Sequence, residues 1–392
     1  MDKLNTFHRA LFVSALSAVL AVSFTAVNAH AIGITKEIKR PDGTLLLEIP
    51  MRDGVRDGRA KLYGDDGTLH SEYTYKNDKK DGPEFVFWPD GRLQTCRMYK
   101  ESVAEGMTRH YANDGWIQSE QMYKNGKREG LTVNYYKDGK LKLEQPYSAG
   151  KRMGTLKLYD DKGILFCEQP YVNNMKEGIT KSYQGFVPMK LDSEYVAKLH
   201  DKKCYRTGQL IKEEAYKDDK LEGTTKYYSP AGTVDREDDY SLGRLTMVRE
   251  YYEDRTLKTE QPYSGGKCNG IVRYYNNAGR LRSETPHVDD MRQGIEKAYY
   301  ASGELESEQN YRDDRLDGIT RVFYPSGKVK AIKYYKGGES EGPWKFFYED
   351  GKIRSEGLFS EGKLTGKWAH YDESGNVVSE STYYKEQDEK ER

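Results

Sequence analysis

Apolar and polar residues alternate in short runs along this chain, and the runs are separated by turns that contain glycine. In the stretch YYKDGKLKLEQPYSAGKRMG, residues 135–154, two tyrosines precede an Asp-Gly pair, and Leu, Glu and Tyr follow it. Alternation with a period of two is typical of a β-strand. Glycine tolerates the positive φ that tight hairpin turns need. The stretch therefore predicts one β-hairpin.

Close copies of this hairpin recur along almost the whole chain, mostly 23 or 24 residues apart, with one interval of 45 residues. The turn residues that mark the fourteen copies are Gly43, Gly67, Gly91, Gly115, Gly139, Gly163, Gly208, Gly232, Arg255, Gly279, Gly303, Gly327, Gly351 and Gly375. Numbered from this turn residue as zero, position +2 is always aliphatic and position +5 is Glu in twelve copies. Position +8 is Tyr in eleven copies, position −4 is aromatic in twelve, and position +15 is Gly in twelve. Such self-similarity indicates one repeat array.

The spacing within a copy predicts how the hairpins pack. Positions +2 and +8 have the same parity, so we expect the aliphatic residue and the Tyr on one face and the +5 Glu on the other. We expect the +15 Gly to break the strand and to start the next hairpin. A lone hairpin is marginal in water, whereas stacked hairpins share an apolar face. We therefore predict an all-β fold: an elongated, twisted, single-layer antiparallel sheet of about fourteen stacked β-hairpin repeats of 24 residues, with one inserted loop or short helix.

Two departures from the repeat stand out. The long interval contains an insertion at residues 184–204, where Asp192 or Ser193 can cap a short helix. A surface loop without a role and a partner-contact element both fit this insertion. Cys167 precedes it and Cys204 ends it, which makes these two cysteines a candidate disulfide in an oxidising compartment. At the other departure Arg255 replaces the turn glycine, and the preceding Asp can still support a turn.

The first 31 residues have the form of a targeting segment, with a basic start, an apolar core over 11–27 and the sequence AHA at 29–31. This pattern predicts a signal peptide cleaved after Ala31, although an apolar run of this length can also anchor a protein in a membrane. We expect an exported protein, periplasmic or secreted. The predicted organisation is a signal peptide (1–31), a first repeat block (32–183), the insertion (184–204), a second repeat block (205–384) and a charged tail (385–392).

Composition and charge narrow the classes of function. The chain has 63 basic and 63 acidic residues, and this balance argues against binding to nucleic acid, which needs a net basic field. The stretch 121–152 is locally basic, so a solvated face and a contact with anionic lipid are both open. The seven His residues are scattered and form no HExxH or similar metal motif, and the chain contains no GxSxG elbow. We expect no cofactor, no metal and no enzymatic activity. We expect the Glu column to pair with Lys or to accept hydrogen bonds from the turns rather than to bind cations.

Six tyrosines at position −3 face opposite to the −4 column by strand alternation. Exposed Tyr is favoured at protein interfaces, so these residues are the candidate partner surface. They are Tyr136, Tyr205, Tyr252, Tyr300, Tyr324 and Tyr348.

The pattern YY..DG.L..E..Y..G...G resembles the bacterial variant of the MORN repeat (membrane occupation and recognition nexus) over about residues 39 to 384. The variant family is often described as resembling the antitoxin component of toxin–antitoxin systems, so the resemblance implies a non-catalytic protein that binds another protein. The broader family is associated with membrane lipids and with scaffolding. We therefore expect a protein-binding scaffold, antitoxin-like in the finer reading. The alternatives are a lipid-binding scaffold at the cell envelope and, less favoured, an enzyme that modifies an envelope polymer.

Overall fold

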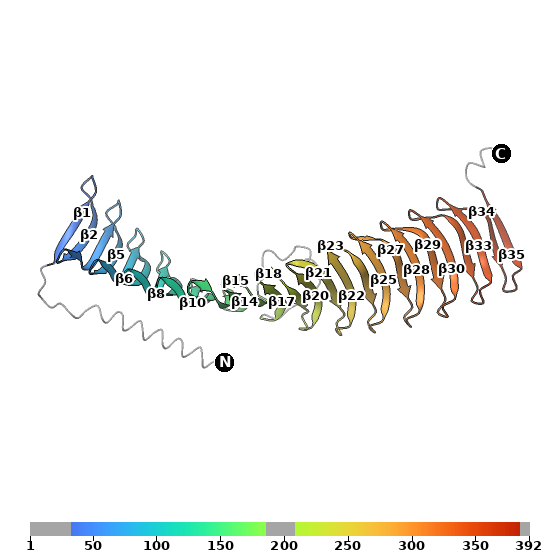
Figure 1. The fold of residues 1–392 in the computed structure, drawn as a ribbon, viewed down its shortest axis with the longest axis horizontal. Coiled ribbons are helices and arrows are strands. Elements are labelled where there is room, and N and C mark those ends of the chain that lie inside the picture. The colour runs from blue at the N-terminus through green and yellow to red at the C-terminus, as the bar shows by residue number, and fades with distance from the viewer. Residues whose placement is uncertain (1–32, 186–207, 385–392) are drawn as a thin grey trace. The chain divides into compact units, whose positions relative to one another are not determined.

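The computed structural model describes residues 33–185 and 208–384, which form 35 strands and no helix, and every strand pairing within them is antiparallel (Figure 1). The predicted all-β sheet of hairpin repeats is therefore confirmed. The predicted signal peptide and the charged tail lie outside the described residues, as does almost all of the insertion. The described strands belong to two units, one that ends at Trp116 and one that begins at Ile117.

The first unit contains eight strands. They are β1 (Ile34–Lys39), β2 (Leu45–Arg52), β3 (Val55–Arg56), β4 (Gly58–Tyr63), β5 (Leu69–Lys76), β6 (Lys79–Phe87), β7 (Leu93–Lys100) and β8 (Val103–Tyr111).

The second unit contains the other strands, in the same repeating order. They are β9 (Ile117–Lys124), β10 (Lys127–Tyr135), β11 (Leu141–Ser148), β12 (Lys151–Arg152), β13 (Gly154–Tyr159), β14 (Leu165–Val172), β15 (Met175–Lys176), β16 (Gly178–Tyr183), β17 (Leu210–Lys217), β18 (Lys220–Leu221), β19 (Gly223–Tyr228), β20 (Val234–Ser241), β21 (Arg244–Tyr251), β22 (Leu257–Ser264), β23 (Lys267–Cys268), β24 (Gly270–Tyr275), β25 (Leu281–Val288), β26 (Met291–Arg292), β27 (Gly294–Tyr299), β28 (Leu305–Arg312), β29 (Arg315–Phe323), β30 (Val329–Lys336), β31 (Glu339–Ser340), β32 (Gly342–Phe347), β33 (Ile353–Ser360), β34 (Lys363–Tyr371) and β35 (Val377–Tyr383).

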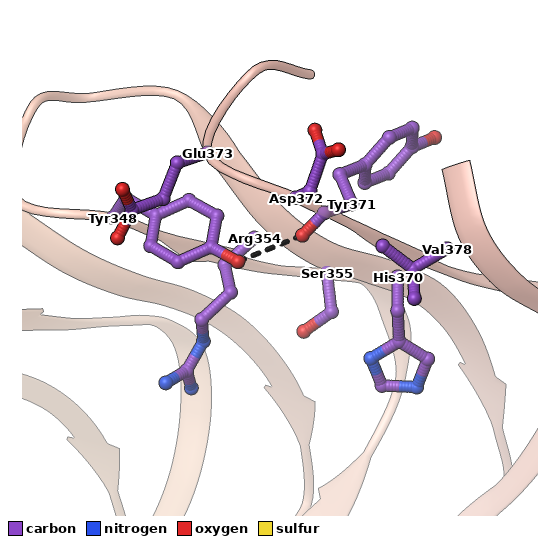
Figure 2. A pocket seen from close by; sticks show the side chains of 8 residues that line it. All are labelled: Tyr348, Arg354, Ser355, His370, Tyr371, Asp372, Glu373 and Val378. Carbon is purple, nitrogen blue, oxygen red and sulfur yellow. Dashed lines mark hydrogen bonds between the residues drawn. The ribbon is translucent and has the colours of Figure 1, made fainter. Parts of the chain in front are cut away.

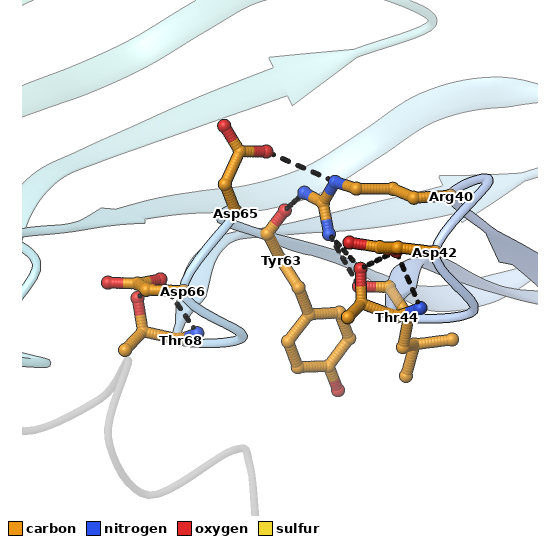
Figure 3. Close-up of polar contacts among 8 residues, drawn as sticks. Arg40, Asp42, Thr44, Tyr63, Asp65, Asp66 and Thr68 are labelled. Atoms are coloured by element: carbon orange, nitrogen blue, oxygen red, sulfur yellow. Dashed lines mark hydrogen bonds and ion pairs between the residues drawn. The ribbon is translucent and has the colours of Figure 1, made fainter.

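The glycine that marks each copy closes a four-residue turn. At the turn between β4 and β5, the Gly67 amide donates to the Gly64 carbonyl at 3.0 Å, and Gly67 has a φ of +75°. The Asp66 carboxylate accepts hydrogen bonds from the amide of Thr68 at 3.0 Å and from its hydroxyl at 2.7 Å (Figure 3). These bonds stabilise the ionised form, so the pKa of Asp66 lies below its ordinary value. The Asp-Gly pairs in the sequence therefore make the turns that they predict.

The first thirteen copies each contain a second turn, of two residues, that was not predicted, and the chain reverses there rather than at the +15 glycine. The chain reverses at positions +10 and +11, where both residues have positive φ, as a type I′ turn requires. These pairs are Asp53–Gly54, Asn77–Asp78, Glu101–Ser102, Asn125–Gly126, Ala149–Gly150, Asn173–Asn174, Asp218–Asp219, Leu242–Gly243, Gly265–Gly266, Asp289–Asp290, Asp313–Asp314, Gly337–Gly338 and Glu361–Gly362. The +15 glycine instead interrupts strand pairing. At Gly58, with a φ of +120°, a Cβ would lie 2.9 Å from Pro50 Cγ, so the glycine allows a close approach.

The two faces of the sheet also differ from the parity expectation. Leu62 pairs with Ser71, but the next residue, Tyr63, pairs with Leu69, so a β-bulge lies between these pairs. Cross-strand partners share a face, so the bulge puts the aliphatic residue at +2, Leu69, on the same face as the tyrosine at −4, Tyr63. The glutamate at +5 lies on that face too. The prediction that the residues at +2 and +8 share a face is therefore wrong. The Tyr at +8 and the Glu at +5 lie on opposite faces, because side chains alternate along the strand that carries both.

The two departures from the repeat are accommodated inside turns. The Gly208 amide donates to the Gln184 carbonyl at 2.9 Å, and the Gln184 amide donates to the Gln209 carbonyl at 2.7 Å. These bonds are the same as those that close the turn in the other copies, so β16 and β17 are held together as in the rest of the array, and the insertion between them lies outside the described residues. At the other departure, Arg255 keeps the left-handed turn conformation, with a φ of +70°, and Asp254 accepts from the Thr256 amide at 2.9 Å, as the sequence predicted.

Candidate interaction surface

The candidate tyrosines at position −3 join neighbouring copies. Each described member donates its hydroxyl to the backbone carbonyl of the −4 residue in the next copy, at 2.7–2.8 Å. The donors and acceptors are Tyr136 to Tyr159, Tyr252 to Tyr275, Tyr300 to Phe323, Tyr324 to Phe347 and Tyr348 to Tyr371. Their rings are half-buried, so each tyrosine both supports the stack and leaves part of its ring accessible. Arg40 makes the same contact in the first unit, with its guanidinium 2.6 Å from the Tyr63 carbonyl (Figure 3).

Tyr205, the sixth candidate, lies outside the described residues. The hydrogen bonds of position −3 in its copy are made by Gln184, on the other side of the insertion. Counting back from Gly208 along the sequence therefore assigned this position to the wrong residue.

A ladder of tyrosine and glutamate runs along the opposite face. The −4 Tyr hydroxyl donates to the +5 Glu carboxylate of the preceding copy at 2.7–3.2 Å. The pairs are Tyr63–Glu48, Tyr135–Glu120, Tyr159–Glu144, Tyr183–Glu168, Tyr228–Glu213, Tyr251–Glu237, Tyr275–Glu260, Tyr299–Glu284 and Tyr371–Glu356. Sequence reasoning missed these contacts between copies, because they depend on how the hairpins stack.

Ion pairs complete the same ladder. Lys345 lies 3.1 Å from Glu356, and Arg273 lies 2.9 Å from Glu284. The expected pairing of the Glu column with basic residues is confirmed at these positions. Burial first, and the adjacent carboxylates second, raise the pKa of the ladder tyrosine Tyr159 above its ordinary value. The neutral hydroxyl therefore remains the donor at physiological pH.

The other face carries the +8 tyrosines above a floor of small side chains. The floor residues Ala60, Ser71, Thr108 and Thr225 are at most 1% exposed. Cations lie over several of the tyrosine rings, for example Arg56 at 4.5 Å from the centre of the Tyr75 ring. We refer to this side of each unit as the tyrosine face.

Two pockets lie at turns between copies. The first, of about 540 Å³, is lined by Tyr348, Arg354, Ser355, His370, Tyr371, Asp372, Glu373 and Val378 (Figure 2). The hydrogen bond drawn in it is the contact between copies from Tyr348 to the Tyr371 carbonyl. The second, of about 340 Å³, is lined by Gly64, Asp65, Asp66, Thr68, Leu69, His70, Phe87, Trp88 and Pro89. Within residues 33–185 and 208–384, no group of three His, Cys, Asp or Glu side chains is placed to hold a metal ion.

The cysteines are placed as follows. No two of the described cysteines, Cys96, Cys167 and Cys268, are joined by a disulfide. Burial raises the pKa of Cys167 to about 11. Cys204 lies outside the described residues, so its pairing with Cys167 stays a prediction.

Comparison with known proteins identifies the repeat. The family described as MORN repeat variant matches seven segments: 56–77, 104–125, 128–149, 292–313, 316–336, 340–361 and 364–385. No curated protein matches the chain. No helix in the described part of the chain is long and apolar enough to cross a membrane.

Solved structures with some likeness include the crystal structures of TcdB2-TccC3-TEV and of TcdB2-TccC3-Cdc42. They are 12% and 9% identical to this chain, and the matches cover 91% and 88% of it with TM-scores of 0.16 and 0.13. The chain spans only 24% and 27% of their lengths, and scores this low carry no argument about function. The seven family matches agree in spacing and content with the hairpins of both units, and on this ground the chain is a repeat protein of the MORN repeat variant family.

Proposed function

We propose that this protein is an exported, non-catalytic scaffold that binds another protein through the faces of its repeat sheet. The observation that carries the proposal is that the sheet is a single layer, so its side chains are accessible from both sides. The principal contacts of each described strand are with its neighbours in the sheet. Large apolar side chains stay exposed, including Ile179 at 52%, Ile295 at 48% and Val288 at 52%. Exposed apolar side chains of this kind are groups that a bound protein can cover.

The −3 tyrosines are the first contact residues to test. Tyr348 is half-buried and lines the larger pocket, where its ring is accessible beside Arg354 (Figure 2). Tyr348→Ala removes both the ring and the hydrogen bond to the next copy, whereas Tyr348→Phe removes only the hydrogen bond. A contact role predicts that the Phe variant keeps the partner and that the Ala variant loses it.

The finer reading is that the binder acts as an antitoxin-like inhibitor, which covers the active surface of the protein that it binds. This reading rests on the family resemblance. It predicts that the partner is toxic when it is made without the scaffold and harmless when the two are made together. Toxicity that does not depend on the scaffold would leave a binder without an antitoxin role.

Affinity capture tests the proposal. The full chain with a C-terminal tag is made in its own cells, purified from the envelope and extracellular fractions, and analysed by mass spectrometry with an unrelated tagged exported protein as control. We expect one protein to be enriched, and we expect the captured chain to begin at Ile32. Enrichment of nothing above the control would contradict the proposal. Recovery of a chain that retains residues 1–31 would contradict the predicted cleavage alone.

A membrane-apposed scaffold is the second candidate, favoured by the basic stretch 121–152. In this stretch Lys124, Lys127, Lys137, Lys142 and Lys151 are exposed. Exposed Lys side chains near an anionic bilayer are each worth about 1 kcal/mol. Flotation of the purified chain with phosphatidylglycerol vesicles at low salt, and its loss at high salt, would favour this function.

A further inference from the structure

The tyrosine face changes composition at the C-terminal end of the second unit. Position −7 forms part of the floor of this face, and in most copies it is a small or aliphatic residue, such as Ala60, Thr132 or Val272. In the last two copies the same position is Trp344, on β32, and Trp368, on β34. Two large aromatic residues therefore replace the small residues that form the floor elsewhere.

These tryptophans form a continuous cluster with their neighbours. The Trp344 ring centre lies 4.3 Å from that of Phe359 and 5.5 Å from that of Tyr335. The Trp368 ring lies 5.9 Å from Phe359 and 6.2 Å from Phe346. We refer to these five residues, on β30 and β32–β34, as the aromatic cluster. All five are half-buried, and the strands that carry them contact chiefly their neighbours in the sheet.

Two cations touch the cluster without a carboxylate partner. Lys333 Nζ lies 4.9 Å from the centre of the Trp344 ring, and Arg354 Cζ lies 5.9 Å from that of Phe346. Neither cation forms an ion pair within the described part of the chain. At two other places on the tyrosine face the cation has its own anion: Lys80 pairs with Glu84 at 2.8 Å, and Arg236 pairs with the buried Asp238 at 2.7 Å. At the cluster, tryptophan at −7 occupies the position that Glu84 holds in its copy.

The single acidic residue on β30, β32, β33 and β34 is Glu356, and its carboxylate is turned to the opposite face. Glu356 lies between Ser355 and Gly357 on β33, and it accepts a hydrogen bond from the Tyr371 hydroxyl at 3.1 Å. It also pairs with Lys345 at 3.1 Å. The cluster side of these strands is therefore aromatic and cationic, which is complementary to an anionic ligand with apolar groups.

We propose that the aromatic cluster, with Lys333 and Arg354, is the docking site for an extended acidic segment of the partner protein. This inference rests on the proposed protein-binding function and names the chemistry of the partner. Carboxylates of the segment would pair with the two cations, and its apolar side chains would pack between the rings. The cluster spans the neighbouring strands β30, β32, β33 and β34. Three strand spacings amount to about 14 Å, which about five residues of extended chain can cover.

The ring geometry favours a polypeptide over a glycan. The ring planes of Trp344 and Phe359 are tilted by 38°, and those of Phe359 and Trp368 are perpendicular, at 90°. A flat platform for stacked sugar rings needs nearly coplanar aromatic residues, whereas tilted rings leave gaps that fit branched and aromatic side chains. Trp, Tyr and Arg are also the residues that contribute most at protein interfaces.

Fluorine NMR offers a test in which the protein supplies its own control. The chain has four tryptophans, two in the cluster and two, Trp88 and Trp116, in the first unit. The full chain labelled with 5-fluorotryptophan is titrated with a 12-residue peptide of repeating Glu-Phe-Asp-Leu. We expect the Trp344 and Trp368 resonances to shift and the other two to stay. A charge-reversed Lys-Phe-Lys-Leu peptide and a Glu-Ser-Asp-Ser peptide are expected to bind at least tenfold more weakly.

Charge variants make the test specific to this face. The double variant Lys333→Glu, Arg354→Glu is expected to weaken binding at least tenfold. Lys258→Glu changes an exposed cation at the position equivalent to Arg354 in another copy, and it should bind like the wild type. The Trp344 and Trp368 resonances of the double Glu variant without peptide show whether the cluster itself is unchanged. If they differ from those of the wild type, the milder double variant Lys333→Gln, Arg354→Gln is used instead.

Several results would overturn the inference. They are no binding of the acidic peptide, equal binding of its charge-reversed form, and full affinity after charge reversal of the two cations. Displacement by polygalacturonate with the same tryptophan shifts would assign the site to an acidic glycan instead. Capture from the cell extract distinguishes the docking site from the scaffold function. A partner that binds the wild type and the double Glu variant equally well refutes the docking site but still supports the scaffold function.

Discussion

Replacing Gly357 with alanine should disrupt the aromatic cluster, because the Trp368 indole lies directly on the backbone of this glycine. A Cβ at position 357 would lie 1.9 Å from Trp368 Cε3 and 2.6 Å from Cδ2. Contacts under 3.0 Å do not occur at real Cβ atoms, so the indole must move by more than 1 Å. Aromatic side chains over glycines are a known way of stabilising strands.

The expected cost follows from what the indole loses. Overpacking of this kind costs about 1–3 kcal/mol. Loss of the perpendicular contact with Phe359 and the tilted contact with Phe346 removes up to about 0.5–1.5 kcal/mol for each pair. Trp368 is half-buried and can swing outward, which limits the total. We expect local stability to fall by about 1–2 kcal/mol.

The assay has to report on one part of the array, because long repeat arrays do not unfold in a single step. Hydrogen exchange of the strands β33 and β34, followed by mass spectrometry, measures this local stability. The fluorine resonance of Trp368 reports the movement of the ring. In a Trp368→Leu background the same Gly357→Ala change should cost less, since the clash is relieved. Unchanged exchange together with an unchanged Trp368 resonance would refute the packing described here.

Three further predictions concern other parts of the second unit. Arg255→Gly should stabilise its turn by about 1 kcal/mol, since Arg255 holds a φ of +70° at a position where glycine carries no steric penalty; an equal or lower midpoint in urea would contradict this. Tyr159→Phe removes the hydrogen bond to Glu144 and should flatten the loss of stability between about pH 9 and about pH 11.5. Burial and Glu144 raise the pKa of Tyr159 in the folded protein, so the stabilisation by its neutral hydroxyl is complete below the ordinary pKa of 10.0 and is lost as the pH rises above that value. A variant whose unfolding free energy falls as steeply as that of the wild type in this alkaline range would contradict the prediction. After reduction, the Cys167 thiol, with its pKa raised to about 11, should react with iodoacetamide at pH 8 about a hundredfold more slowly than an ordinary thiol. Alkylation before reduction tests the predicted pairing with Cys204, because a disulfide leaves Cys167 without a thiol to alkylate.

The sequence predicted the repeat unit well because its turns are local. Asp66 and Gly67 make their turn from their own side chain and backbone, and the turn glycine recurs in thirteen of the fourteen copies. The two-residue turns escaped notice because their composition varies, from Asn77–Asp78 to Leu242–Gly243. Their shared property is positive φ, which several residue types can adopt.

Contacts between copies were harder to predict. The bond from Tyr63 to Glu48 spans 15 residues and depends on the stacking register, which one copy does not encode by itself. The bulge next to Tyr63 moves the +2 residue to the other face, and parity counting has no signal for it. The aromatic cluster did leave a signal, since Trp344 and Trp368 stand in a column that is otherwise made of smaller residues. Comparing the copies column by column would have found it.

Site-specific photo-crosslinking in intact cells tests whether a protein partner binds the tyrosine face at the aromatic cluster. A benzoylphenylalanine is placed at His370, which is exposed and lies beside Trp368 in the cluster, or at Leu358, which is 43% exposed and alternates with Gly357 and Phe359 onto the opposite face. If the tyrosine face binds the partner, position 370 should give a light-dependent adduct with one protein and position 358 should give none. No adduct from either position, or an adduct from position 358 alone, would contradict it.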